Sequence, residues 1–283
     1  MMPSIREPVV AGAFYPGSRS ALIAGLTLLL KRKVHVEGTL CEPMGLVVPH
    51  AGYIYSGAVA AAGYRELAAH GRPEWAIILG ANHTGLGSPI SIAREGVWRT
   101  PLGDAPIATE VADSLVAEGV TVADEAFLHE HSIEVQLPFL QFLFGAEIPF
   151  IPICVMFPIL SDLTALGEAI ARVVRGKARG KAGVVIVSSD FTHYEPDETA
   201  RSVDHRAIEK ILALDVQGFY RSLIEERLSI CGGGAIVALM ACARRLGWDE
   251  RKLLSYATSG DVTGESHSVV GYAAISLTGR KDG

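Results

Sequence analysis

Short, uninterrupted runs of apolar residues recur along the chain, and they limit the folds that it can adopt. The clearest runs are MGLVV at 44–48, WAIIL at 75–79, FIPICV at 150–155 and VVIVS at 184–188. Their apolar residues do not alternate with polar ones, which is typical of strands covered on both faces. Segments with helical spacing separate them, as at 56–71 and 160–174. The alternation predicts an α/β fold with a mainly parallel central sheet and helices on both faces.

Other segments extend this sheet. Residues 253–260 and 267–277 resemble two closing strands that pair antiparallel and make the sheet mixed, and residues 89–93 and 96–100 resemble a hairpin. Helical spacing also covers 199–214, 216–226 and 234–246. The chain has no internal repeat or long polar linker, and 49% of its 283 residues are hydrophobic, enough for a large core. We therefore predict a single domain over residues 1–283.

Charge and cysteine content exclude several classes of protein. The net charge is −6 with histidine neutral, which gives no strong attraction to nucleic acid or to anionic lipid. No apolar run approaches the ~20 residues that span a bilayer, and the N-terminal segment lacks the apolar stretch of a signal peptide. The four cysteines contain no C-x-x-C pair, which argues against a disulfide framework or a structural zinc site. We expect a cytoplasmic protein.

Polar side chains follow several predicted strands at the point where each strand ends. They are His50; Asn82 and His83; Ser189, Asp190 and His193; and Asp261 and Glu265. In open α/β sheets, ligands bind beyond the carboxyl ends of the strands, so these groups should face one site. Two imidazoles and a carboxylate with open positions suit a redox-capable divalent metal, and a further histidine can move a proton. One such histidine alone would be an ordinary hydrogen-bonded residue.

Two other motifs bear on this site. In FLHEHSIEVQLPFL (127–140), His131 and Glu134 share one face if a helix begins near Ser132. In one reading, this segment orients the metal ligands or supplies an extra one. In the other, it is a capped helix start with Ser132 as its N-cap. The glycine run after Cys231 lacks the Lys-Ser/Thr of a phosphate-binding loop, and its glycines allow the backbone to approach the site closely.

With these residues in place, the sequence resembles the Memo family, the "protein B" of the AmmeMemoRadiSam set. The matching motifs are REPVVAGAFYPG, VVPHAGYIYSG, LGANHTG, HEHSIEVQLPFL, SSDFTHYEP, SICGGGAIVALM and SYATSGDVTGESHSVVGYAA. They cover nearly the whole chain in order. The family in turn resembles the class III, non-haem-iron extradiol dioxygenases in fold and site layout.

The resemblance implies roles for individual residues. His50 and His83 would bind the metal, His193 would match the acid/base histidine of the dioxygenases, and Asp190 would orient the site. The third ligand departs from the pattern, because an ungapped count places Val262 at the position of the cysteine of animal Memo proteins. The flanking Asp261 or Glu265 would then take that place, or His131 or Glu134 would complete the site. The implied metal is Fe(II), with copper and zinc as alternatives.

These observations leave different functions open. The first is an Fe(II)-dependent, dioxygenase-like oxidoreductase. The second is a binding module that uses the same pocket for a peptide or small molecule, with Tyr53, Tyr55 and Tyr194 near its mouth. The third is a metal-dependent hydrolase or lyase. The family name also implies a shared pathway with a radical-SAM protein and with the third AmmeMemoRadiSam component.

Overall fold

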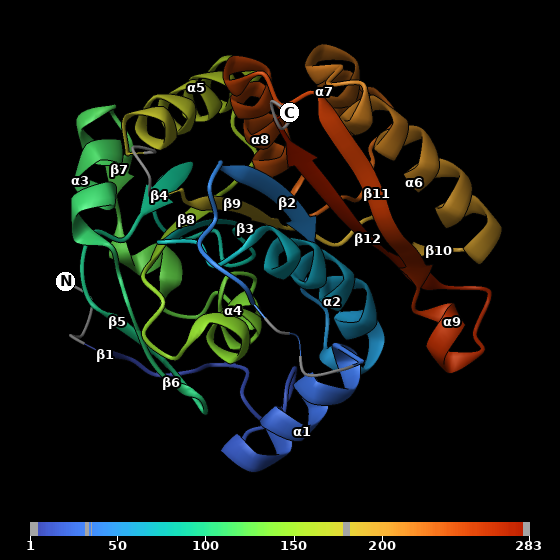
Figure 1. Ribbon diagram of the computed structural model, residues 1–283. Helices are drawn as coiled ribbons and strands as arrows, with labels where there is room; N and C mark the ends of the chain where they lie inside the picture. The colour runs from blue at the N-terminus through green and yellow to red at the C-terminus, as the bar shows by residue number, and fades with distance from the viewer. Residues whose placement is uncertain (1–4, 32–33, 35, 178–181, 280–283) are drawn as a thin grey trace.

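The computed structural model describes residues 5–31, 34, 36–177 and 182–279. In these residues, nine strands form a mixed sheet in the order β10-β12-β2-β9-β3-β8-β4-β7, with β11 paired to β12 (Figure 1). Their bounds are β2 Met44–Val48, β3 Ala76–Ala81, β4 Ile90–Ile92, β7 Thr121–Val122, β8 Phe150–Val155, β9 Val184–Ser188, β10 His193–Glu195, β11 Glu250–Thr258 and β12 Val269–Thr278. This arrangement confirms the predicted α/β class with a mixed central sheet.

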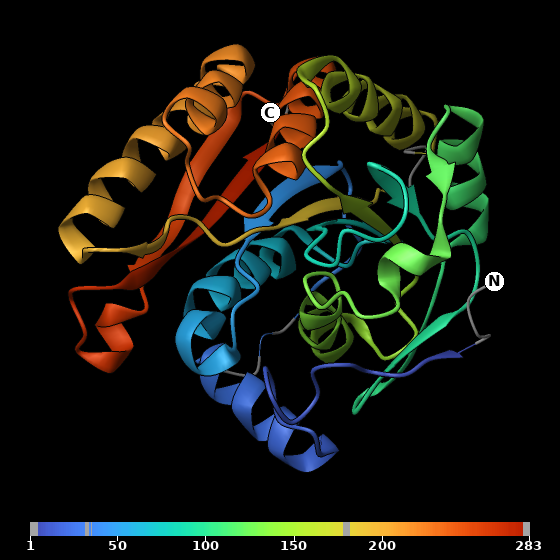
Figure 2. The same ribbon diagram turned by 180° about the vertical axis from the view of Figure 1, so that it is seen from behind.

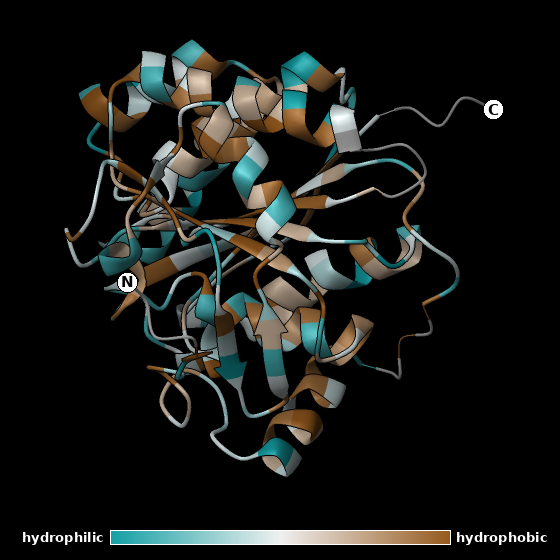
Figure 3. Ribbon diagram, turned by 90° about the vertical axis from the view of Figure 1, so that its left-hand side faces the viewer, coloured by the Kyte–Doolittle hydropathy of each residue, from teal (hydrophilic) through white to brown (hydrophobic). Residues whose placement is uncertain are grey.

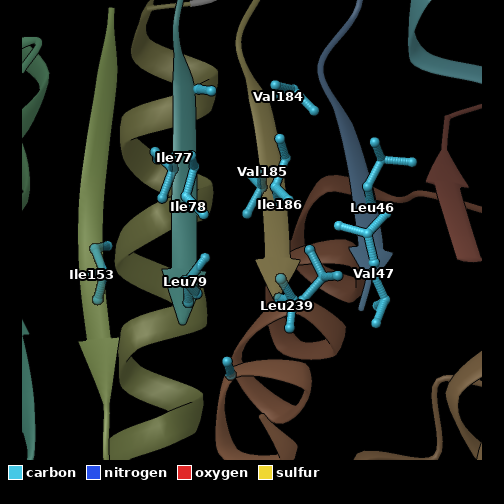
Figure 4. Close-up of a cluster of buried hydrophobic side chains, with 14 of the residues drawn as sticks. Leu46, Val47, Ile77, Ile78, Leu79, Ile153, Val184, Val185, Ile186 and Leu239 are labelled. Carbon is cyan, nitrogen blue, oxygen red and sulfur yellow. The ribbon is translucent and has the colours of Figure 1, made fainter. Parts of the chain in front are cut away.

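The centre of the sheet is parallel and fully buried. Strands β2, β9, β3 and β8 are neighbours in register, with Leu46 opposite Ile186 and Ile186 opposite Ile78. Every residue of these four strands is buried. Figure 4 shows their aliphatic side chains pointing to both faces of the sheet, with Leu239 packed against them from a helix. The uninterrupted apolar runs of the sequence are therefore strands with a core on each side.

Helices form a layer on each face of the sheet (Figure 1). Helices α5 (Leu160–Lys177) and α8 (Gly233–Leu246) cover one face, and α2 (Tyr53–His70) and α4 (Leu137–Phe144) cover the other. Figure 3 shows the brown, hydrophobic strands running between the two layers. The remaining helices are α1 Arg19–Leu29, α3 Thr109–Ala117, α6 Asp197–Leu212, α7 Val216–Glu225 and α9 Gly260–Thr263, with 3-10 turns η1 Asp124–Phe127 and η2 Glu134–Gln136.

Two local predictions were wrong. Residues 89–93 and 96–100 do not form a hairpin: β4 joins the large sheet antiparallel to β8, whereas β5 (Val97–Thr100) pairs with β6 (Gly103–Pro106). Together with β1 (Ile5–Arg6), β5 and β6 make a separate three-stranded sheet. The helical segment expected from near Ser132 begins as a 3-10 turn at Glu134 and continues as α4 from Leu137. Neither start has a side-chain cap, and the Ser132 hydroxyl donates to the Ala81 carbonyl instead.

The parallel strands bring their carboxyl ends to one edge of the sheet. The loop after β3 (teal) and the loop before α4 (green) meet at this edge in Figure 2, where the His83 amide donates to Glu130 at 2.6 Å. Gly80 lets them approach: a Cβ at this position would lie 2.4 Å from the Ser132 Oγ. The fold thus places two loops, distant in sequence, against each other.

Close packing of α5 on α8 gives the first prediction. A Cβ at Gly167 would lie 2.2 Å from the Ala238 carbonyl oxygen and 2.7 Å from the Ala241 Cβ. Gly167→Ala should therefore destabilise the protein by about 1–3 kcal/mol, although alanine favours helix more than glycine does. Urea unfolding monitored by circular dichroism measures the change.

Gly176, on the same helix, is the matched control. A Cβ there meets nothing within 4 Å. Gly176→Ala should stabilise the protein by at most about 1 kcal/mol, through helix propensity alone. Equal effects of the two substitutions would contradict the proposed helix contact.

Candidate metal centre

Three histidines converge at the carboxyl edge of the sheet. His50 follows β2, His83 follows β3, and His131 lies in the loop before η2. One nitrogen of each lies within 4.8 Å of one nitrogen of each of the others. The ring centroids of His50 and His83 are 5.3 Å apart, and those of His83 and His131 are 4.8 Å apart. In the described part of the chain, these three form the group of side chains arranged to hold a metal ion.

The hydrogen bonds of Ser188 fix the tautomer of His50. The Ser188 hydroxyl donates its single hydrogen to the Ser132 carbonyl at 2.6 Å. It must therefore accept from its other neighbours, the Gln136 amide at 2.7 Å and His50 Nδ1 at 3.1 Å. The hydrogen of a neutral His50 is thus on Nδ1, and Nε2 carries a free lone pair. Burial lowers the pKa of His50, so the imidazole is neutral at pH 7.

A cysteine faces that lone pair. The Cys231 Sγ lies 3.2 Å from His50 Nε2 and 3.2 Å from the amide nitrogen of Asp190. Burial raises the pKa of the Cys231 thiol, so without a cation it stays protonated. Gly232 permits this approach, since a Cβ there would lie 2.5 Å from the Ser189 Cβ. Cys231 is thus a fourth potential donor beside the histidines.

The carboxylate of Glu130 organises the other two histidines. It is fully buried and accepts from the His83 amide, from His83 Nδ1 at 3.0 Å and from the amides of His131 and Ser132. Its Oε1 also lies 3.5 Å from His131 Nδ1. With Nδ1 turned to the carboxylate, each imidazole leaves Nε2 available for a ligand.

The charges in this group alter several pKa values. Burial opposes the charge of Glu130, but the hydrogen bond and positive charge of His83 outweigh it and lower the pKa of Glu130 to about 2. Burial likewise opposes protonation of His83, yet Glu130 raises its pKa above the usual value. Burial and the neighbouring His50 lower the pKa of His131 to about 4. Near pH 7, therefore, His50 and His131 are neutral and His83 holds its proton more tightly.

Asp190 and His193 support the site from β9 and β10. The Asp190 Oδ1 accepts from the amides of His50 and Ala51, at 2.8 and 3.2 Å, and its Oδ2 lies 4.0 Å from His50 Nε2. His193 lies outside the group of three. Its Nδ1 is 2.8 Å from the Ser229 carbonyl, which can only accept, so Nδ1 carries a hydrogen. Ser229 stands two residues before Cys231, which ties His193 to the edge of the site.

The carboxylates expected as the third ligand lie elsewhere. Asp261 pairs with Arg201 at 2.8 Å and accepts from the Thr258 amide. Glu265 accepts from the backbone amides of Ser266 and His267. Val262, on α9, is 56% exposed. The structure thus does not bring Asp261 or Glu265 into the group of three histidines. A cysteine does lie beside His50, but it is Cys231, far from Val262 in sequence.

The other predicted pocket residues have mainly structural contacts. Glu134 is fully buried in an ion pair with Arg6, and the Tyr53 hydroxyl donates to the Val135 carbonyl at 2.6 Å. The Asn82 side chain accepts from Thr84 and Gly85 and so shapes the turn after β3. Ser189 accepts from the Gly232 amide at 3.0 Å. Sequence reasoning missed the role of Glu130, although its place between two histidines was a signal for it.

The donor set fits a transition metal. Three imidazoles and a thiol are the ligands that iron, copper and zinc accept, whereas magnesium and calcium prefer oxygen. Metal–imidazole bonds of ~2.0–2.1 Å require ligand nitrogens about 3–4 Å apart, so a spacing within 4.8 Å needs only a small contraction. The 37% exposure of the His83 side chain opens the site to solvent on that side.

The fold and the site together define an α/β protein with a three-histidine centre at the carboxyl edge of its sheet. A family model described as "Memo-like protein" matches residues 6–276. A MEMO1 family protein of Methanopyrus kandleri is 43% identical over 278 residues, which covers 95% of this chain and 98% of that protein. One from Methanosarcina acetivorans is 44% identical over 271 residues, covering 96% and 98%. The chain belongs to the Memo family.

A solved structure shares the fold at low sequence identity. It is an uncharacterized protein, JW3007, from Escherichia coli K12, with a TM-score of 0.57 and 12% identity, and the match covers 83% of this chain and 99% of that one. A separate finding concerns membranes: none of the helices in the described residues is both long and apolar enough to cross one.

Glu130→Gln tests the electrostatics of the site. Glu130 raises the pKa of His83, so its neutral replacement should leave burial as the dominant effect and bring that pKa below 6.5. Titration of the histidine Cε1–H signals by NMR measures the shift. Glu125→Gln, at the surface of η1, serves as the control. An unchanged His83 titration in Glu130→Gln would contradict the assigned pairing.

Proposed function

We propose that the protein is a metal-dependent oxidoreductase with Fe(II) as its metal, held by His50, His83 and His131 with Cys231 as a further donor. One observation carries this proposal: one nitrogen from each of His50, His83 and His131 lies within 4.8 Å of one nitrogen of each of the others. The Cys231 thiol lies beside this group, 3.2 Å from His50 Nε2. Copper would also suit these donors, and zinc would direct the site to hydrolysis instead. The resemblance to class III dioxygenases supports the choice of iron and redox chemistry.

The surrounding residues prepare this site for chemistry. When bound, the metal supplies a Lewis acid and a redox centre for a substrate in its open positions. Ser188 holds His50 in the tautomer that exposes Nε2, and Glu130 orients His83 and His131. His193 donates or accepts a proton at Nε2, since its Nδ1 is held by the Ser229 carbonyl. Asp190 keeps the backbone of the His50 loop in place.

The site differs from the two-histidine, one-carboxylate pattern of many non-haem iron enzymes. Its buried carboxylate, Glu130, lies behind two of the histidines rather than beside them. The donors are therefore neutral imidazoles plus one ionisable thiol. We infer that the ligand is a small molecule or peptide that enters beside the exposed edge of His83. A pathway shared with a radical-SAM protein and the third AmmeMemoRadiSam component rests on the family resemblance.

Metal content is the first test. The protein should be purified anaerobically and without a histidine tag, beside His50→Ala/His83→Ala and His193→Ala. We expect about one equivalent of iron in the wild type and in His193→Ala, and none in the double variant, because two of three imidazole ligands are lost. Inductively coupled plasma mass spectrometry measures it.

The other outcomes separate the alternatives. One equivalent of zinc, lost in the same double variant, would favour a hydrolase or lyase. No metal in the wild type, even after reconstitution with Fe(II), copper or zinc, would refute the metal site. The histidines would then form the floor of a binding pocket, and the second function would replace the first.

Metal affinity should depend on pH through His83. Its pKa is raised, so a proton competes with the metal at higher pH than at an ordinary histidine. Because the Cys231 thiol also loses its proton on binding, affinity for Zn²⁺ should fall, as the pH is lowered, about tenfold per pH unit above the His83 pKa and up to about a hundredfold per unit below it, where two protons must leave. Calorimetry in buffers of different ionisation enthalpy counts the released protons, and below the His83 pKa the count should drop in Glu130→Gln.

A further inference from the structure

A buried arginine anchors the N-terminal segment to the loop that carries His131. Arg6, on β1, donates from Nε to the Phe127 carbonyl at 2.7 Å and from Nη2 to the Glu130 carbonyl at 2.6 Å. Its Nη1 donates to the Glu134 carboxylate at 2.8 Å. All three acceptors belong to residues 127–134, the segment that contains Glu130 and His131. One guanidinium thus holds both ends and the middle of this loop.

Glu134 completes the contact from the other side. Its Oε2 accepts from Arg6 and from the Val9 amide, and its Oε1 accepts from the Val10 amide and the Tyr15 hydroxyl. Every one of these donors belongs to residues 6–15. The carboxylate is fully buried, and its acceptor sites are filled by the N-terminal segment alone.

The shape of arginine is needed here. The guanidinium lies 4.0 Å from the centre of the Trp98 ring, a stacking contact that a planar cation makes best. Its three hydrogen bonds point in different directions in one plane, which a lysine ammonium cannot reproduce. A lysine would keep the charge near Glu134 but lose the carbonyls of Phe127 and Glu130.

We propose that Arg6 and Glu134 are positioning residues of the metal centre, so that the N-terminal segment and the metal stabilise each other. This rests on the proposed metal site. Arg6 fixes the backbone carbonyl of Glu130, whose carboxylate holds His83 and His131. The effect therefore reaches the ligands through Glu130. By linkage, metal binding must strengthen the docking of residues 6–15 by the same factor.

Substitution with Co²⁺ tests this without an activity assay, since its d–d absorption reports ligand number and geometry. Arg6→Lys and Glu134→Gln should each lower Co²⁺ affinity about tenfold and weaken or shift these bands. Arg172→Lys is the matched control, because Arg172, on α5, makes a surface pair with Glu118 and not with residues 6–15. Thr100→Val, which breaks a buried hydrogen bond to Gln141, controls for lost stability alone. Both controls should keep wild-type affinity and spectrum.

Amide hydrogen exchange in the wild type tests whether metal binding stabilises the docking of residues 6–15, even if a variant does not fold. The Val9 and Val10 amides, which donate to Glu134, should exchange more slowly when Zn²⁺ is added, by about the factor found for affinity. Wild-type affinity in both variants, or exchange unaffected by Zn²⁺, would overturn the inference and leave the metal site intact. A wild type that binds neither Co²⁺ nor Zn²⁺ would overturn the proposed function and this inference together.

Discussion

The site depends on the hydrogen bonds that the buried carboxylate of Glu130 accepts. An ionised carboxylate without partners is too costly to bury, and Glu130 meets this cost with the amides of His83, His131 and Ser132 and with the His83 imidazole. These partners come from two loops that are far apart in sequence. The bonds that compensate this one charge therefore also set the distance between His83 and His131, and these two residues cannot separate without leaving the buried carboxylate without partners.

The sheet and its edge were predictable because they follow from local patterns. Unbroken, β-branched apolar runs such as 184–188 are typical of strands buried on both faces, and parallel strands end at one edge. These patterns predict the α/β fold with its mixed sheet, which the structure confirms, and they place His50 and His83 at the edge where the structure brings them together. The resemblance that identified the Memo family depended on the same motifs, since glycines and histidines at strand ends serve both the fold and the site.

The rest of the site depends on contacts that no local pattern encodes. Asp261 follows a strand, as His50 does, yet its carboxylate forms an ion pair with Arg201 on α6. Cys231 lies just before α8. Because α8 packs across the sheet, the position of Cys231 beside His50 depends on tertiary packing. Residues 89–93 and 96–100 have hairpin composition, but β5 finds its partners in β1 and β6. For Asp261 and Cys231, and for β4 in its pairing with β8, a partner distant in sequence decided between equally plausible local structures.

Charge balance explains why the thiol and the carboxylates occupy different positions. A divalent cation among three neutral imidazoles would be poorly compensated in a buried site. Glu130 and Asp190 supply negative charge just behind the ligands, where they orient rather than bind. The Cys231 thiol, protonated when alone because it is buried, would ionise beside a metal. In the proposed metal site, the thiol would therefore be the one directly binding anion, and only with the metal bound, which would favour soft and redox-active ions over magnesium or calcium.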